Sequence, residues 1–144
     1  MRKEFTIPGE PKGKQRPRVT MRGGYATTYT PKETVSYENF VRMCFIQQCG
    51  REMLEGAIEA DITAYYSIPK SVSKTKHRQM CSGEIRNVKK PDCDNLAKIV
   101  LDSLNGIAYH DDSQICELSV SKLYGEEPGV VVFLQTIDEI KGTK

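Results

Sequence analysis

The stretch AIEADITAYYSI, residues 57–68, alternates apolar and polar residues along its whole length. Successive side chains of a β-strand point to opposite faces of a sheet, so this alternation predicts a long strand with one buried face. Pro69 follows directly and ends it. The fold is therefore expected to contain a sheet that is covered on one side.

A helix is expected upstream of this strand, over residues 31–50. Residues 30–33, TPKE, have the form of a capping box with proline at the first helical position. Apolar residues then recur at spacings of three and four, which predicts one stripe that packs on the sheet. The stripe consists of Tyr37, Phe40, Val41, Cys44 and Phe45.

The remaining segments complete a fold expected to be α+β, with a mixed β-sheet and packed helices in a single domain over residues 1–144. A short strand is predicted at residues 4–7, before a long Gly- and Arg-rich loop, and a short helix within residues 70–84. A second helix is predicted at 95–104, ending at the Asn-Gly pair 105–106. Alternation at 116–120 and the apolar run 130–137 predict an antiparallel hairpin whose second strand is central.

Composition narrows the class of protein. The chain has 144 residues, 38% hydrophobic and 28% charged, as in ordinary soluble domains. No apolar run approaches the roughly 20 residues of a membrane span, and the N-terminus lacks a secretory pattern. Five cysteines without a CxxC pair argue against a disulfide framework. We therefore expect a cytoplasmic protein without a membrane segment.

The net charge is only +2, but the charges are unevenly distributed. Residues 11–32 contain six Lys or Arg and no acid, and residues 70–90 contain seven against Glu84 alone. Such clusters commonly contact phosphates, although many basic surfaces are merely solvated. The candidate DNA-binding residues are Arg16, Arg18, Arg22, Lys74, Lys76, Arg78, Lys89 and Lys90.

Five of the seven aspartates lie within residues 92–112. In an extended segment Asp92 and Asp94 would point the same way, and the turn at Asp111 and Asp112 could supply a third carboxylate. Mg²⁺ prefers oxygen ligands and usually takes one or two carboxylates, so these residues are candidate metal ligands. Lys98 would then neutralise charge that grows on a phosphate.

Ordinary structure could account for each part of this cluster. Asp94 could cap the helix, Lys98 and Asp102 could form a surface pair, and Asp111 and Asp112 could form a turn. The pairing of Asp92 with Asp94 is the part that these alternatives do not explain, because close carboxylates repel. Spacing alone leaves a nuclease and other uses of the cluster open.

The segment KPDCDNLAKIVLDSLNG, followed by HDDSQI, resembles the signature of the RusA family of Holliday-junction resolvases, approximately KPDxDNLxKxxxDxLNG and then DDxQI. The upstream KQRPRV and YTPKET are also similar to that family. The resemblance implies an endonuclease that needs Mg²⁺, or Mn²⁺ in its place. It would act as a two-fold homodimer on four-way DNA junctions in recombination and repair, in a host or a prophage.

Carried over by position, the resemblance implies that Asp92, Asp94 and Asp112 are the essential acids and Lys98 the catalytic lysine. Asp111 matches the first residue of the acidic pair, as a second-priority ligand, and Asp102 is a further family acid. Two alternatives remain: a junction-binding protein whose cutting is vestigial, and a general metal-dependent DNA nuclease.

Overall fold

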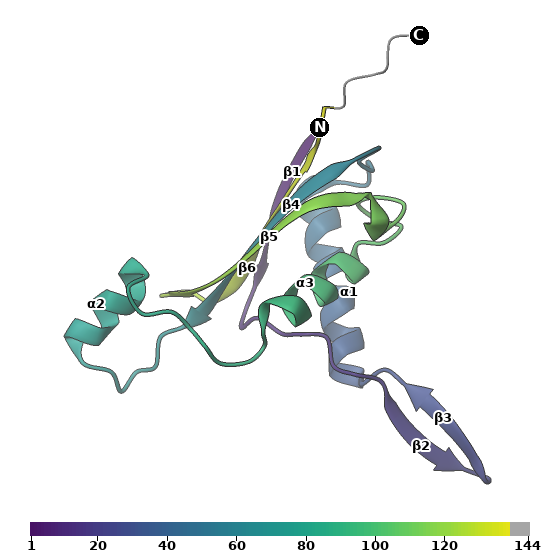
Figure 1. Cartoon of the computed structure of the whole chain (residues 1–144), viewed down its shortest axis with the longest axis horizontal. Helices are drawn as coiled ribbons and strands as arrows, with labels where there is room; N and C mark the ends of the chain where they lie inside the picture. The colour runs from purple at the N-terminus through teal and green to yellow at the C-terminus, as the bar shows by residue number, and fades with distance from the viewer. Residues whose placement is uncertain (139–144) are drawn as a thin grey trace.

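Four strands form the main sheet in the computed structural model, which describes residues 1–138 (Figure 1). They are β1 (Arg2–Pro8), β4 (Ile58–Ser67), β5 (Ile115–Gly125) and β6 (Gly129–Thr136), in the order β1-β6-β4-β5. Strand β6 is antiparallel to β1 and β4, whereas β5 runs parallel to β4. The predicted mixed sheet in an α+β fold is confirmed.

The alternation in β4 matches its burial. Every second residue from Ile58 to Tyr66 is buried, and the intervening side chains are exposed or half-buried. The buried face continues on the neighbouring strand through Val130, Val132 and Leu134, each with no exposed surface. Burial of this continuous apolar layer is the main stabilising contribution to the fold.

Two helices, α1 (Lys32–Cys49) and α3 (Cys93–Ser103), cover one face of the sheet (Figure 1). The expected stripe of α1 faces inward, and Phe45 meets Phe5 of β1 edge to face at 5.4 Å between ring centroids. Arg42 Nε of α1 donates to Ser103 O at the end of α3 (2.9 Å), which ties the helices together.

The start of α1 differs from the prediction. Pro31 is the N-cap, with φ −54° and ψ 140°, and no side chain caps the helix. Because the helix begins at Lys32, Thr30 lies one position too early to act as the capping residue, and the predicted capping box is wrong. The predicted end is confirmed, since Gly50 is the C-cap with φ 81°.

The predicted hairpin of the last two strands is also wrong, because β4 lies between β5 and β6. The connection crosses the end of β4, where a Cβ on Gly125 would lie 3.1 Å from Tyr65 Cδ1. Where the connection enters β6, a Cβ on Gly129 would lie 3.2 Å from Ile7 O of β1. The glycines permit this close crossing, and the prediction that β6 is central is confirmed.

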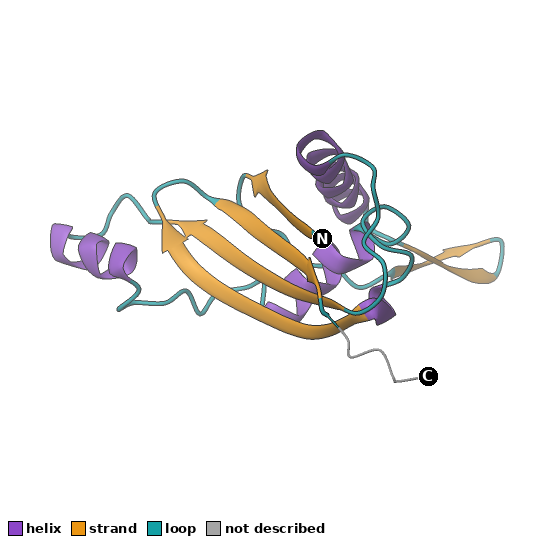
Figure 2. Ribbon diagram, turned by 90° about the horizontal axis from the view of Figure 1, so that it is seen from above, coloured by secondary structure: helices purple, strands orange, loops and turns teal. Residues whose placement is uncertain are grey.

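Two small elements project from the body at opposite ends. The segment expected to be a loop contains a hairpin, β2 (Arg18–Arg22) and β3 (Tyr25–Tyr29), that extends away from the sheet (Figure 1). Gly23 and Gly24 have positive φ, as two-residue hairpin turns require. At the other end lies the predicted short helix, α2 (Lys74–Ser82) (Figure 2).

Among residues 1–138, none of the helices combines the length and apolar character needed to cross a bilayer.

Candidate active site

The N-terminus of α3 is built around Asp92. This residue is the N-cap, and the Asn95 backbone N–H donates to its Oδ1 (3.0 Å). The helix begins at Cys93, two residues earlier than predicted, so Asp94 already lies in the first helical turn. The expected extended arrangement of the two aspartates is therefore wrong, as is Asp94 as the cap. Both carboxylates are nevertheless exposed at one helix end, where the helix dipole favours negative charge.

Two turns further along α3, Asp102 receives two cations. Lys98 Nζ lies 3.3 Å from Asp102 Oδ2, as the four-residue spacing indicated. Lys14, from the loop before β2, approaches the same oxygen at 3.5 Å and also contacts Glu38 Oε2 of α1 at 3.0 Å. Lys98 is 61% exposed in its side chain, whereas Lys14 is 22% exposed. Lys14 is thus held inside the structure, and Lys98 remains accessible to a ligand.

The acidic turn is a short 3₁₀ helix, η1 (Asp112–Gln114), with Asp111 as its N-cap. The Ser113 backbone N–H donates to Asp111 Oδ2, and Gln114 Oε1 accepts from the Asp111 backbone N–H, which completes a capping box. Gln114 Nε2 also donates to the carbonyls of Leu54 and Gly56. Gln114 therefore fixes the turn against the loop before β4.

Asp112 lies in an environment that opposes its ionisation. Burial is the largest cause and raises the pKa of its carboxyl. Repulsion by Asp111 and a shared hydrogen bond with Asp102 raise this pKa further. Hydrogen bonds from Ser113 lower the pKa of Asp111, so Asp111 ionises more readily than Asp112. The fully buried Tyr109 lies beneath, with its hydroxyl donating to Leu101 O (2.6 Å).

The candidate acids form two groups along α3. Asp102, Asp111 and Asp112 lie at one end, and Asp92 and Asp94 lie at the other. The helix rise of about 1.5 Å per residue separates Asp94 from Asp102 by about 12 Å along the axis, with Lys98 midway. Within residues 1–138, the oxygens of Asp92, Asp94 and Asp112 are not gathered within 4.8 Å of one another.

The donor chemistry of these groups fits a hard divalent cation. All the candidate ligands are carboxylate oxygens, and crowding of like charges around Asp112 is the condition that a bound cation relieves. Mg²⁺ usually takes only one or two carboxylates and fills its other positions with water and phosphate oxygens. The residues offer such ligands in two groups rather than as a single cage of three oxygens.

The candidate DNA-binding residues lie on both projecting elements and beside α3. Arg16 and Arg18 are exposed at the base of the β2–β3 hairpin, and Arg22 lies in β2, with its side chain outside the described part of the structure. The other members are all exposed, on α2 or immediately before α3: Lys74, Lys76, Arg78, Lys89 and Lys90. Basic side chains therefore flank the acidic helix.

Sequence analysis missed the buried support of Asp102. Glu38 is only 9% exposed, although it is charged, and Lys14 was not distinguished from its basic neighbours. One signal was available: Glu38 follows Thr34 by four residues and precedes Val41 by three, so it lies on the buried stripe of α1. A charge at such a position predicts a buried partner.

An acidic helix and turn on a mixed sheet, between exposed basic segments, are features of a metal-dependent nuclease. A profile of the family described as endodeoxyribonuclease RusA matches residues 8–135. The chain is also 36% identical over 136 residues to the uncharacterized protein YqaN of Bacillus subtilis (strain 168), covering 93% of this chain and 96% of that protein.

The chain belongs to the RusA endodeoxyribonuclease family. Membership confirms the resemblance seen in residues 90–115 and identifies the chain as an endodeoxyribonuclease. It implies activity on branched DNA, at Holliday junctions, and nucleases of this family are generally dependent on a divalent metal.

Proposed function

We propose that this protein is a Mg²⁺-dependent Holliday-junction resolvase that acts as a homodimer and makes paired, symmetric nicks. Asp92, Asp94 and Asp112 are proposed to supply the metal ligands, with Asp111 as a further ligand, from the two groups at the ends of α3. Lys98 is proposed to contact the scissile phosphate. The reaction is hydrolysis of a phosphodiester bond in each of two strands.

The observation that carries the proposal is the arrangement of acids around Lys98. Asp102 and Asp112 are close enough to share a hydrogen bond, and Lys98 both pairs with Asp102 and lowers the pKa of Asp112 electrostatically. A polyanion placed here would meet one exposed ammonium among carboxylates. Such a surface repels DNA unless a divalent cation also binds, so cation and substrate binding are expected to depend on each other.

The roles of the chain's own residues follow from their surroundings. When bound, the metal would supply a polarised phosphoryl oxygen and a water of lowered pKa. Asp102 holds Lys98 in position along α3, so that its ammonium can face charge developing on the phosphate without first reorienting. Gln114 holds the turn that carries Asp111 and Asp112 against the loop before β4.

The basic segments support binding of a branched substrate. Arg16 and Arg18 lie at the base of the β2–β3 hairpin. The other three residues lie on α2, at the opposite end of the molecule (Figure 2): Lys74, Lys76 and Arg78. Separate basic elements on both sides of one site can contact separate duplex arms. A two-fold dimer would place two such sites on the two strands that must be cut.

The test is cleavage of a labelled synthetic four-way junction beside a linear duplex of the same sequence, with Mg²⁺ or EDTA, using the wild-type protein and Asp92→Asn. Paired symmetric nicks that require Mg²⁺ and Asp92 support the proposal. Sedimentation velocity of the protein, alone and with the junction, measures whether the protein is a dimer.

Other outcomes select the alternatives. Tight junction binding without nicks under Mg²⁺ or Mn²⁺ would indicate a vestigial nuclease that retains binding. Equal cutting of the linear duplex would indicate a general nuclease.

A further inference from the structure

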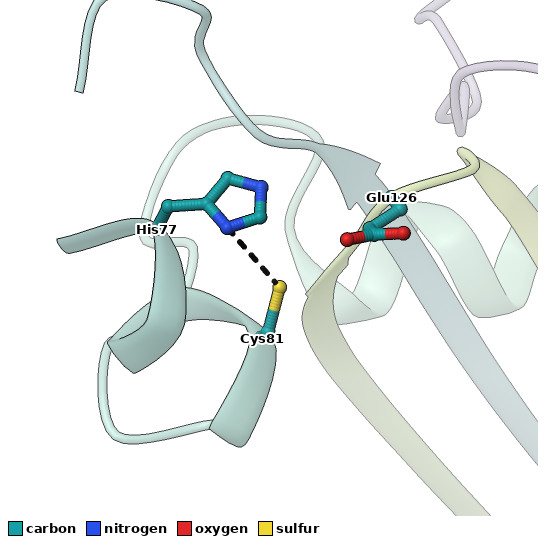
Figure 3. A group of neighbouring side chains, drawn as sticks. All are labelled: His77, Cys81 and Glu126. Carbon is teal, nitrogen blue, oxygen red and sulfur yellow. Dashed lines mark hydrogen bonds between the residues drawn. The ribbon is translucent and has the colours of Figure 1, made fainter. Parts of the chain in front are cut away.

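Three side chains with metal-binding atoms meet far from the aspartates. His77 and Cys81 lie on one side of α2, and Glu126 lies in the turn between β5 and β6 (Figure 3). The ligand atoms of all three lie within 4.8 Å of one another. Figure 3 shows the imidazole, the thiol and the carboxylate converging between the helix and the turn.

The separation of the first two ligands suits a tetrahedral ion. His77 Nδ1 and Cys81 Sγ are 3.7 Å apart. Zinc bonds of about 2.0 Å to nitrogen and 2.3 Å to sulfur, at the tetrahedral angle, place two such ligands about 3.5 Å apart. The four-residue spacing on one helix therefore already holds two ligands nearly at the distance that zinc requires.

The donor set also selects the metal. A thiolate and an imidazole favour zinc over the Mg²⁺ expected at the carboxylates of α3. Binding would release the thiol proton of Cys81, and zinc with one thiolate and one carboxylate forms a neutral group, so it adds no negative charge beside Lys74, Lys76 and Arg78. Glu126 is exposed and makes no hydrogen bond or ion pair to another side chain within residues 1–138, so its carboxylate can rotate toward the ion.

A bridge at this position would act on a weakly attached element. Met80 is the one residue of α2 that is buried, and the helix extends beyond the end of the sheet (Figure 1). We propose that His77, Cys81 and Glu126 bind a zinc ion that fastens α2 to the β5–β6 turn, with water in the fourth position. The ion would fix the orientation of the basic side chains on α2.

Cobalt(II) titration of the reduced, chelator-treated full-length protein tests this site directly. Cobalt bound to a thiolate has a charge-transfer band in the near ultraviolet, which carboxylate-bound cobalt at the aspartates lacks. One equivalent should give the band, and zinc should abolish it by displacement. Cys81→Ser and His77→Gln should lose the band, whereas Cys116→Ser, which removes another exposed thiol, should keep it.

The role of Glu126 and the fastening of α2 need two further measurements. Glu126→Gln should weaken zinc binding by about tenfold or more, since even losses outside the ligand shell cost that much. Zinc should slow amide hydrogen exchange in residues 74–82 of the wild type and not of Cys81→Ser. A missing band at one equivalent, or a band that survives Cys81→Ser, would overturn the site. Unchanged exchange in a protein that binds zinc would overturn the fastening.

Discussion

The Asp112 carboxyl is placed where ionisation is unfavourable. Its raised pKa means that the folded protein holds the proton more tightly than the unfolded chain does. The charged form therefore destabilises the fold at pH values above the ordinary carboxyl range, and protonation at lower pH relieves this cost. A carboxylate that costs stability when it is charged is a candidate functional residue, which supports the proposal of Asp112 as a metal ligand.

Asp112→Asn is expected to stabilise the metal-free protein and to abolish its response to Mg²⁺. An amide removes the repulsion from Asp111 and can still donate to Asp102, so the melting temperature in EDTA should rise by roughly 1–3 °C. Thermal unfolding with and without Mg²⁺, together with junction cleavage, measures both effects. Asp61→Asn, an exposed aspartate on β4, is the control and should change neither. A variant that melts lower in EDTA would contradict this account of Asp112.

Lys98 is expected to matter for cleavage rather than for stability. Its pair with Asp102 is largely solvent-exposed on the lysine side, so Lys98→Met should change the free energy of unfolding by no more than about 0.5 kcal/mol. Because Lys98 is proposed to face the scissile phosphate, loss of its ammonium should reduce the rate of junction cleavage by about 100-fold or more. Single-turnover cleavage and urea unfolding separate the two effects. A nearly wild-type rate would remove Lys98 from the reaction.

Lys14, in contrast to Lys98, is expected to contribute to stability. Lys14→Met leaves the nearly buried Glu38 without its cation, which should lower the free energy of unfolding by about 1–3 kcal/mol. Replacing both partners, with Lys14→Met and Glu38→Leu together, should recover most of that loss. Urea unfolding of the two single variants and the double variant gives the coupling. Additive losses would show that the pair contributes little.

At the scale of elements, the loop before β2 is fastened to α3 through a close backbone approach at Gly13. A Cβ at this position would lie 2.7 Å from Pro91 Cβ and 3.0 Å from Asn95 Cβ. The next residue adds a hydrogen bond, from the Lys14 N–H to Asn95 O (3.2 Å). This approach sets the loop against the helix end that carries Asp92.

Gly13→Ala is therefore expected to push the loop away from α3. The overlap should cost about 1–3 kcal/mol in the free energy of unfolding, measured by urea denaturation. Cleavage should fall as well, because Lys14 and the start of α3 move apart. Lys12→Ala, at the exposed neighbouring position, should stay within about 0.5 kcal/mol of the wild type. Equal stability of Gly13→Ala would mean that the loop can shift freely.

Periodicity predicted the elements well where one face is buried. The strand around Ile62, the stripe of α1 and the apolar side of α3 each repeat over enough residues to be recognised. Strand pairing could not be derived in the same way. Neighbouring strands in sequence usually pair, yet β4 enters between β5 and β6, and nothing local in either strand encodes a partner 50 or more residues away.

The β2–β3 hairpin was missed for a related reason. Its residues are almost all exposed, so no alternation of buried and exposed positions marks its strands. The paired glycines 23 and 24 were the available signal, and they specify the turn rather than the strands.

The candidate site was predictable in its residues but not in its geometry. The signature fixed Asp92, Asp94, Lys98 and Asp112 by position, whereas the assumption of an extended segment placed Asp94 incorrectly. Whether a residue near a helix start is extended or helical depends on which side chain caps it, and Asp92 and Asp94 are equally suitable by type. Assignment of metal ligands among these residues stays a prediction.

At the scale of the whole molecule, the basic elements extend in different directions from the acidic helix (Figure 1). We expect the hairpin to contribute to DNA affinity without contributing to stability, because β2 and β3 form a sheet of their own. Arg16→Gln with Arg18→Gln should reduce the magnitude of the salt dependence of junction binding, with a change of about 0.9 in slope for each phosphate that the variant no longer neutralises.

Binding isotherms at several salt concentrations measure this slope, and unfolding in urea should be unchanged. Arg51→Gln, an exposed arginine beyond the other end of α1, is the control and should leave the slope as it is. A slope unaltered by the double substitution would exclude the hairpin base from the DNA-binding surface.

The central position of β6 also determines when the sheet can form as the chain emerges from the ribosome. A growing polypeptide that has emerged as far as residue 125 contains β1, β4 and β5, but it lacks the strand that joins β1 to β4. Until β6 leaves the ribosome, the edges of β1 and β4 that it joins stay unpaired, and such edges invite aggregation. The main sheet is therefore expected to assemble only once residues 129–136 are free to pair with both β1 and β4.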